Sequence, residues 1–110
     1  MKTINAEELK KKLEANGDFI LINVLSKDSF EAKHVPKSIS IPVDDLEQRA
    51  PAELPDKDKE IIVYCANLQC QASPTAAKKL EEIGYTNVTD YENGIAGWQD
   101  AGYGFEGDAV

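Results

Sequence analysis

Basic residues are scarce in this sequence. Its 110 residues include 12 Lys or Arg against 20 Asp or Glu, and the formal net charge is −8. Nucleic-acid binding requires a basic surface, and the one dense group of lysines, Lys10 to Lys12, falls in a stretch with helical spacing, where it forms a solvated face. We therefore expect no nucleic-acid partner, and the acidic charge also disfavours acidic lipid surfaces.

Long apolar runs are also missing. No stretch approaches the ~20 apolar residues of a membrane-spanning helix, and residues 1–9 lack the apolar core of a secretory signal. We expect a cytoplasmic protein with no membrane partner.

Cysteines are few, two in all, and in a reducing compartment such a pair is more often free, catalytic or redox-active than a structural disulfide.

Histidine is rarer still, and His34 is the only one. A structural zinc site has four protein ligands, which one Cys-x4-Cys pair and one distant histidine do not supply. The acidic residues are scattered, with no pair placed for acid–base catalysis. We expect no metal and no cofactor.

Apolar runs and helical patterns alternate along the chain, and 42% of the residues are hydrophobic, which supports one globular domain. The run 19–25 is apolar on both faces, as in a parallel strand covered on both sides. The alternation predicts an α/β fold with a parallel sheet. The expected strands are 3–4, 19–25, 38–41, 61–64 and 86–91, and the expected helices are 6–16, 28–32, 44–49, 74–83 and 94–101, with a surface connection at 50–59.

The stretch 61–80, IIVYCANLQCQASPTAAKKL, combines a strand, a loop and a helix start. The strand ends at Cys65, Cys70 follows in the loop, and Ser73 and Pro74 suit the N-cap and first position of a helix. Functional groups in parallel sheets collect beyond the carboxyl ends of the strands. Cys65 is therefore our candidate nucleophile, and the alternative is a buried small hydrophobe that continues the strand.

Activation of Cys65 has to come from the backbone. A free thiol has a pKa of ~8.5 and is mostly protonated at pH 7, and no Lys, Arg or His lies between Tyr64 and Ala77. A helix N-terminus supplies only roughly 0.3–1 kcal/mol, so loop N–H groups must stabilise the thiolate. We expect the substrate-binding loop to consist of Ala66, Asn67, Leu68, Gln69, Cys70, Gln71, Ala72 and Ser73.

The role of Cys70 stays open at this point. Its sulfur could fill space in the loop, resolve an intermediate on Cys65, accept sulfur itself, or face a bound anion as a donor.

The chain from Phe19 to Trp98 resembles a single-domain rhodanese, a sulfurtransferase. The matching segments, in the order of the family, are FILINV, FEAKHVPKSISIPVDDL, ELPDKDKEIIVYC, AAKKLEEIGYTNV and ENGIAGW. The resemblance implies a rhodanese-like α/β fold, with a five-stranded parallel sheet and helices on both faces. It implies one domain over residues 1–110, and we expect an ordered core of about 3–102 and a flexible tail at 103–110.

The resemblance also implies that Cys65 takes up a sulfane sulfur as a persulfide and passes it to a thiophilic acceptor. Two departures from the family concern charge. Leu25 ends the segment Asn23-Val24-Leu25, where the family has Asp-Val-Arg, and the loop is longer than usual and carries no cation. This loop looks like the subset with a Cys-x4-Cys spacing. Since each missing charge-assisted bond is worth about 1.5–3 kcal/mol, we expect persulfide or polysulfide donors to outperform thiosulfate.

Further departures and supporting residues follow from the same comparison. Lys33 and Lys37 stand where the family has glycine. His34 matches a Glu-x-x-His pattern with Glu31, and bracing of the loop is favoured over a role as general base. Asn23 ends a strand on the active-site side, where a hydrogen-bond anchor is favoured over direct contact with the loop.

We therefore predict a sulfurtransferase that acts through Cys65. The alternatives are a thiol–disulfide redox or sensing module that uses Cys65 and Cys70, and a non-catalytic rhodanese-like interaction domain. The expected partners are a small sulfur donor and acceptor, or a persulfide-carrying protein, for a monomer or homodimer.

Overall fold

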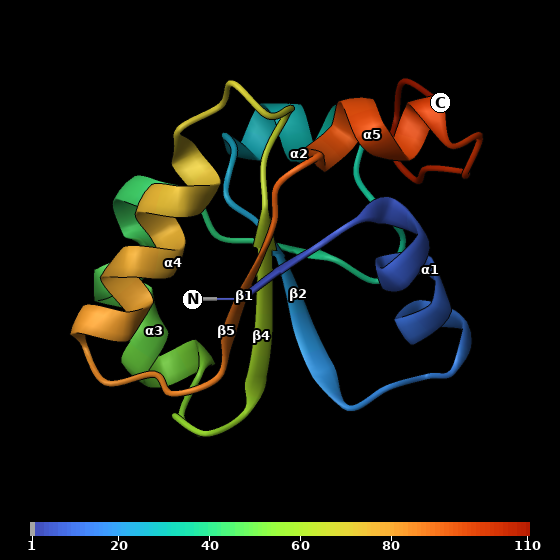
Figure 1. The fold of residues 1–110 in the computed structure, drawn as a ribbon. Coiled ribbons are helices and arrows are strands. Elements are labelled where there is room, and N and C mark those ends of the chain that lie inside the picture. Colours follow the sequence, from blue (N-terminus) through green and yellow to red (C-terminus); the bar gives the residue numbers. More distant parts are fainter. Residues whose placement is uncertain (1) are drawn as a thin grey trace.

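Five parallel strands form the centre of the molecule. The computed structural model describes residues 2–110, and its sheet has the order β1-β5-β4-β2-β3 (Figure 1). The prediction of a five-stranded parallel α/β fold is confirmed. The strands are β1 (Lys2–Ile4), β2 (Phe19–Asn23), β3 (Ile39–Ser40), β4 (Glu60–Tyr64) and β5 (Val88–Tyr91).

Strand β4 lies in the middle of the sheet, between β5 and β2. Its residues from Ile61 to Tyr64 are fully buried, because helices cover both faces of the sheet. This explains why the sequence there is apolar without alternation. The chain leaves β4 directly into Cys65, so the candidate nucleophile starts from the best-buried strand.

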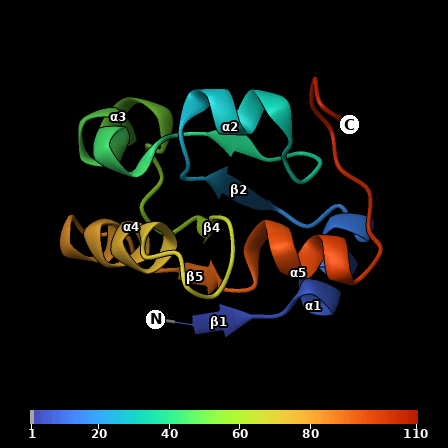
Figure 2. The same ribbon diagram turned by 90° about the horizontal axis from the view of Figure 1, so that it is seen from above.

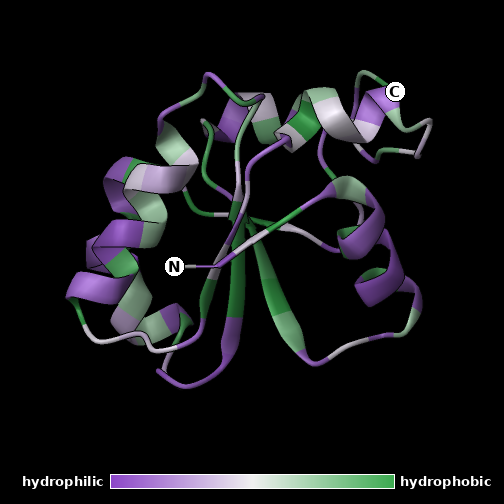
Figure 3. Cartoon of the chain, in the orientation of Figure 1, coloured by the Kyte–Doolittle hydropathy of each residue, from purple (hydrophilic) through white to green (hydrophobic). Residues whose placement is uncertain are grey.

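Helices pack on both faces, as the sequence predicted. Helices α3 and α4 cover one face, and α1 and α5 cover the other, while α2 lies near the carboxyl ends of the strands (Figures 1 and 2). The inner strands are strongly hydrophobic and the helices carry mostly hydrophilic residues outside (Figure 3). No helix within residues 2–110 is both long and apolar enough to cross a membrane. The helices are α1 (Ala6–Glu14), α2 (Lys27–Ala32), α3 (Leu46–Glu53), α4 (Ala72–Glu82) and α5 (Gly94–Asp100), with a 3-10 turn η1 (Val43–Asp45) before α3.

Helix α3 runs past the point where the sequence pattern ended it. We expected a helix to Arg49 and a surface connection from Ala50, but α3 continues through Pro51 to Glu53. Ala50 is fully buried, and the Tyr85 hydroxyl donates to the carbonyl oxygens of Ala50 and Leu54. These tertiary contacts stabilise the helix beyond a proline that local preference alone would make its end.

The chain after α5 packs against α2. His34 and Glu106 exchange both backbone hydrogen bonds, at 2.8 and 2.9 Å. The N–H groups of Asp108 and Ala109 donate to the carbonyls of Glu31 and Ala32. These contacts favour an attached tail over the flexible one expected at 103–110, and its mobility stays a prediction.

Candidate active site

Cys65 lies one residue beyond the carboxyl end of β4 and is 1% exposed. Its carbonyl oxygen accepts the N–H of Ile95 at 3.0 Å, and the Ala66 carbonyl accepts the N–H of Ala96 at 2.9 Å. These donors belong to the first turn of α5, whose N–H groups have no partner inside the helix. The start of α5 therefore holds the base of the cysteine loop.

Gly94 permits this approach between α5 and the loop. Its φ is +62°, and an added Cβ would lie 2.8 Å from the carbonyl carbon of Ala66. Only glycine combines such a backbone conformation with so close a contact. The segment ENGIAGW, one of those that resemble the family, thus lets α5 approach and hold the cysteine loop. We did not predict this role from the sequence.

Asn67 shapes the loop itself. Its Oδ1 atom accepts the N–H groups of Gln69 and Cys70, both at 3.0 Å, and its carbonyl also accepts the Cys70 N–H at 3.2 Å. This is a side-chain-capped turn. Two of the loop N–H groups that we expected to face the sulfur are therefore directed to Asn67 instead.

The turn brings Cys70 back over Cys65, and the two sulfurs form a disulfide. The Cα atoms are 6.4 Å apart, within the range that a disulfide spans. The sequence favoured free, catalytic or redox-active cysteines over a structural disulfide, with a redox pair of Cys65 and Cys70 as one alternative. The structure pairs the two cysteines, because the Asn67 turn folds the loop onto itself.

Helix α4 starts one residue before Ser73, contrary to our expectation that Ser73 is its N-cap. The helix begins at Ala72 with Gln71 as the N-cap residue. Ser73 is buried in the first turn, where its hydroxyl faces Asp90 and favours the charged form of that carboxyl group.

Asp90 is a buried carboxyl group next to the first turn of α4 that the sequence analysis missed. Only 1% of it is exposed, and its Oδ1 atom has no hydrogen-bond partner among residues 2–110. Burial raises the pKa of Asp90, the Ser73 hydroxyl opposes that rise, and the charge of Glu92 adds to it. The available signal was a carboxylate near the carboxyl end of a buried strand, beside the strand that leads to Cys65.

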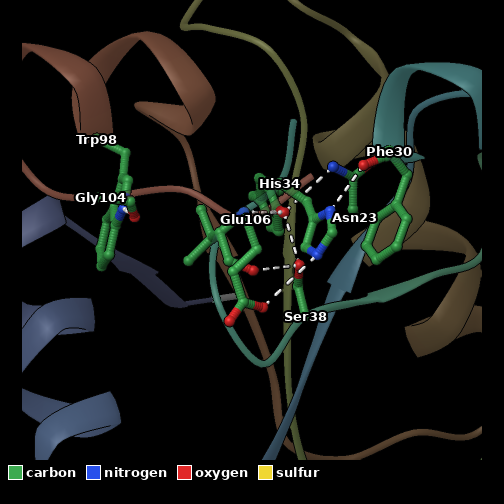
Figure 4. A network of polar contacts seen from close by, with 9 residues as sticks. Asn23, Phe30, His34, Ser38, Trp98, Gly104 and Glu106 are labelled. Atoms are coloured by element: carbon green, nitrogen blue, oxygen red, sulfur yellow. Dashed lines mark hydrogen bonds and ion pairs between the residues drawn. The ribbon is translucent and has the colours of Figure 1, made fainter. Parts of the chain in front are cut away.

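Asn23 is a hydrogen-bond anchor, as the sequence favoured. It is fully buried, its Nδ2 donates to the Tyr64 hydroxyl at 3.1 Å, and its Oδ1 accepts the Leu25 N–H at 2.9 Å. The Tyr64 hydroxyl also accepts the Val35 N–H at 3.0 Å and contacts Ser38 at 2.9 Å (Figure 4). This network ties β2 and the turn before β3, at Val35 and Ser38, to Tyr64, the residue before Cys65.

His34 contacts Phe30 of α2 and Glu106 of the segment after α5. Its ring stacks on Phe30 with centroids 3.9 Å apart, and Nδ1 lies 2.7 Å from the Phe30 carbonyl oxygen (Figure 4). Its Nε2 is 3.8 Å from the Glu106 carboxylate. These contacts favour bracing over the role of general base.

A pocket of about 400 Å³ opens beside the loop. Leu25, Ala66, Ile95 and Ala96 give it an apolar lining, and Lys33 contributes its one charged group. Leu25 occupies the position of the arginine expected from the family resemblance. The tip of the loop is apolar too, since Leu68 is 61% exposed.

The fold and the loop define an α/β domain with a cysteine site at the end of its central strand. Residues 5–101 match the family profile described as Rhodanese-like domain. The chain belongs to the rhodanese-like family, and its relatives include proteins named as sulfurtransferases.

Three similar proteins illustrate how widely the domain is used. The HTH-type transcriptional regulator Rv0324 of Mycobacterium tuberculosis is 32% identical over 99 residues, 90% of this chain and 42% of the regulator. The thiosulfate sulfurtransferase PspE of Escherichia coli is 36% identical over 67 residues, 61% of this chain and 62% of PspE. The rhodanese-like domain of an Anabaena protein has a TM-score of 0.90 at 26% identity, covering 99% of this chain and 81% of that domain's chain. The chain thus spans less than two-thirds of the length of either sequence relative.

Proposed function

We propose that the protein is a sulfurtransferase in which the Cys65 thiolate takes a sulfane sulfur from a donor. In the first step the thiolate attacks the sulfane sulfur of the donor and a Cys65 persulfide forms. The remainder of the donor leaves with the electron pair of the broken S–S bond, as a thiolate from a persulfide or as sulfite from thiosulfate. In the second step an acceptor nucleophile attacks the outer sulfur of the persulfide and releases the Cys65 thiolate. The position of Cys65, at the end of the central strand of a rhodanese-like domain, supports this proposal most directly.

The lining of the site supports a neutral or thiol-derived donor. No cation lies in the loop from 66 to 73, and Leu25 with Ile95 gives the adjoining pocket an apolar lining. The one charged group of that pocket, Lys33, donates to the Gln99 side chain and lies over the Phe105 ring. Thiosulfate is a dianion, so within the loop it would lack the charge-assisted contacts that are each worth about 1.5–3 kcal/mol. We infer that an alkyl persulfide or polysulfide is the better donor, although the relative PspE is named for thiosulfate.

Steady-state transfer to cyanide tests the function. The variant Cys70→Ser, which cannot form the disulfide, is assayed with glutathione persulfide and separately with thiosulfate, and thiocyanate is measured. We expect transfer with both donors and a kcat/KM at least about tenfold higher for the persulfide. The double variant Cys65→Ser, Cys70→Ser is the matched control. A thiocyanate rate that exceeds the protein-free rate and survives loss of Cys65 contradicts the function, whereas efficient use of thiosulfate at low concentration contradicts only the donor preference.

A thiol–disulfide module is the second candidate, and the Cys65–Cys70 pairing favours it. In this role the pair would cycle between dithiol and disulfide without carrying sulfur. Equilibration with glutathione redox buffers, followed by mass spectrometry, should then give a reversible species 2 Da lighter than the reduced protein. The same protein should gain no sulfur from a persulfide donor, and a 32 Da gain rules out this role as the sole function.

A further inference from the structure

We propose that Cys70 releases the sulfur held on Cys65 as hydrosulfide, which makes the protein a persulfide reductase as well as a sulfur acceptor. This inference rests on the proposed function, because it requires the Cys65 persulfide. The Cys70 thiolate attacks the inner sulfur of the protonated persulfide, Cys65–S–SH, and the bond between the two persulfide sulfurs breaks. The outer sulfur keeps its proton and that bond's electron pair, and it leaves as hydrosulfide. The product is the Cys65–Cys70 disulfide, the state that the structure contains.

The geometry selects the inner sulfur as the point of attack. The Cys70 sulfur bonds to Sγ of Cys65 in the structure, and this Sγ is the inner sulfur of a Cys65 persulfide. An attack on the outer sulfur would instead move the sulfur to Cys70. Hydrosulfide is a less basic leaving group than an alkyl thiolate, and a less basic group leaves faster in thiol–disulfide exchange. Cys70 is therefore placed for release of the sulfur.

The loop holds Cys70 in this position by contacts that do not involve the sulfurs. The Cys70 N–H is bound to both Oδ1 and the carbonyl oxygen of Asn67, at 3.0 and 3.2 Å. The opposite end of the loop is held by α5, through the N–H groups of Ile95 and Ala96. Because both ends of the loop are held, the Cys70 thiol has a high effective concentration at Cys65, and its attack is intramolecular.

Burial further favours the internal thiol over an external one. Cys65 is 1% exposed in the disulfide, while Cys70 keeps partial exposure. The pocket beside the loop reaches Ala66 and is not lined by Cys65. An external dithiol consequently meets the Cys70 sulfur first, and its attack there returns Cys65 as the thiolate that accepts the next sulfur.

The full cycle balances with one dithiol reductant. A donor persulfide and a reduced dithiol are converted to the donor thiol, hydrogen sulfide and the oxidised dithiol. The sulfane sulfur receives two electrons, and the external dithiol supplies them. The partner class implied by this chemistry is a dithiol reductant, either a small molecule or a dithiol protein.

A single-turnover experiment tests the role of Cys70. Reduced, desalted protein is mixed with half an equivalent of glutathione persulfide, and hydrosulfide and intact mass are followed. For wild type we expect nearly one hydrosulfide per persulfide added and a species 2 Da lighter. For Cys70→Ser and Cys70→Ala we expect a stable gain of 32 Da and hydrosulfide release at least tenfold slower. Thr75→Ser, an exposed change on the next helix, should behave as wild type.

The outcomes separate the two proposals. If both Cys70 variants gain 32 Da but wild type also keeps 32 Da without releasing hydrosulfide, Cys70 is not the releasing thiol and the transferase stands. A 32 Da gain mapped to Cys70 in wild type likewise overturns attack on the inner sulfur. If neither Cys70 variant gains sulfur, the proposed function itself fails.

Discussion

The backbone N–H of Ile95 donates to the carbonyl oxygen of Cys65 at 3.0 Å. This bond joins the first turn of α5 to the residue that leaves the central strand. A second bond, from Ala96 to the Ala66 carbonyl at 2.9 Å, continues the contact. The cysteine loop is therefore held by the backbone of a neighbouring helix, and its geometry depends on how closely that helix approaches.

Substitution of Gly94 by alanine should loosen this contact. The Cβ would meet the Ala66 carbonyl carbon at 2.8 Å, and the φ of +62° is unfavourable for alanine. Gly102→Ala is the matched control, because Gly102 has a φ of +79° but open space around its Cβ position. In urea unfolding we expect Gly94→Ala to lose about 1–3 kcal/mol more than Gly102→Ala. Equal losses would mean that the close approach is not important for stability.

Lys37 lies in a backbone conformation that suits glycine, at a position where the family resemblance also expects glycine. Its φ is +71°, which costs a side-chain-bearing residue roughly 1–2 kcal/mol. Lys37→Gly should therefore raise the free energy of unfolding by about 0.5–1 kcal/mol, after the extra entropy of glycine in the unfolded chain is subtracted.

Lys33 provides the control for this change. It replaces the other family glycine but has an extended backbone with φ −160°, so Lys33→Gly should lower the stability by about 0.5–1 kcal/mol. Changes of the same sign in both variants would show that backbone conformation does not decide their effects.

Leu25→Arg should improve the use of thiosulfate. Leu25 lines the pocket beside Ala66, and an arginine there would supply one charge-assisted contact worth about 1.5–3 kcal/mol. In the Cys70→Ser background, kcat/KM for thiosulfate should rise roughly ten- to a hundred-fold, with little change for glutathione persulfide. Leu25→Gln, which is polar but neutral, should not reproduce the gain. An unchanged value for the arginine variant would disprove that the missing cation limits thiosulfate.

Asp90 should make stability depend on pH in the acidic range. Because burial raises its pKa above the ordinary value of 3.8, the folded protein binds the proton more tightly than the unfolded chain. The contribution of the Asp90 carboxyl group to the free energy of unfolding is therefore fully present below about pH 3.8. This contribution is lost as the pH rises through the raised pKa of the folded protein.

Two variants test the sign of this effect. Asp90→Asn should be more stable than wild type at pH 7, with the advantage disappearing as the pH approaches 3.8. Ser73→Ala removes the hydroxyl that favours the charged carboxyl group, so its destabilisation should grow as the pH rises. If the free energies of unfolding of wild type and Asp90→Asn differ by the same amount at every pH across this range, the role assigned to the carboxyl group is refuted.

The sequence predicted the elements whose signals are local. The apolar run before Cys65 is the central strand. Helix α1 also begins with a local signal, a capping box formed by Asn5 and Glu8. The order of the strands, β1-β5-β4-β2-β3, was not predicted, because hydrophobic periodicity does not say which strands are neighbours.

The sequence did not predict the contacts that depend on tertiary structure. Nothing local indicates that Tyr85 would extend α3 past a proline, or that the first turn of α5 would bind the Cys65 carbonyl. The pairing of Cys65 with Cys70 depends on the turn made by Asn67. A side chain such as Asn67 has several local turn conformations available, and the surrounding fold selects among them.

Peptide mapping of the Cys70→Ser variant tests the central claim most directly. Trypsin should release residues 60–78, in which Cys65 is then the only cysteine. After brief incubation with glutathione persulfide and removal of the donor, we predict that this peptide carries an additional 32 Da, located on Cys65 and removable by a reductant. An unmodified Cys65 peptide, from protein whose Cys65 still reacts with an alkylating reagent, would contradict the account.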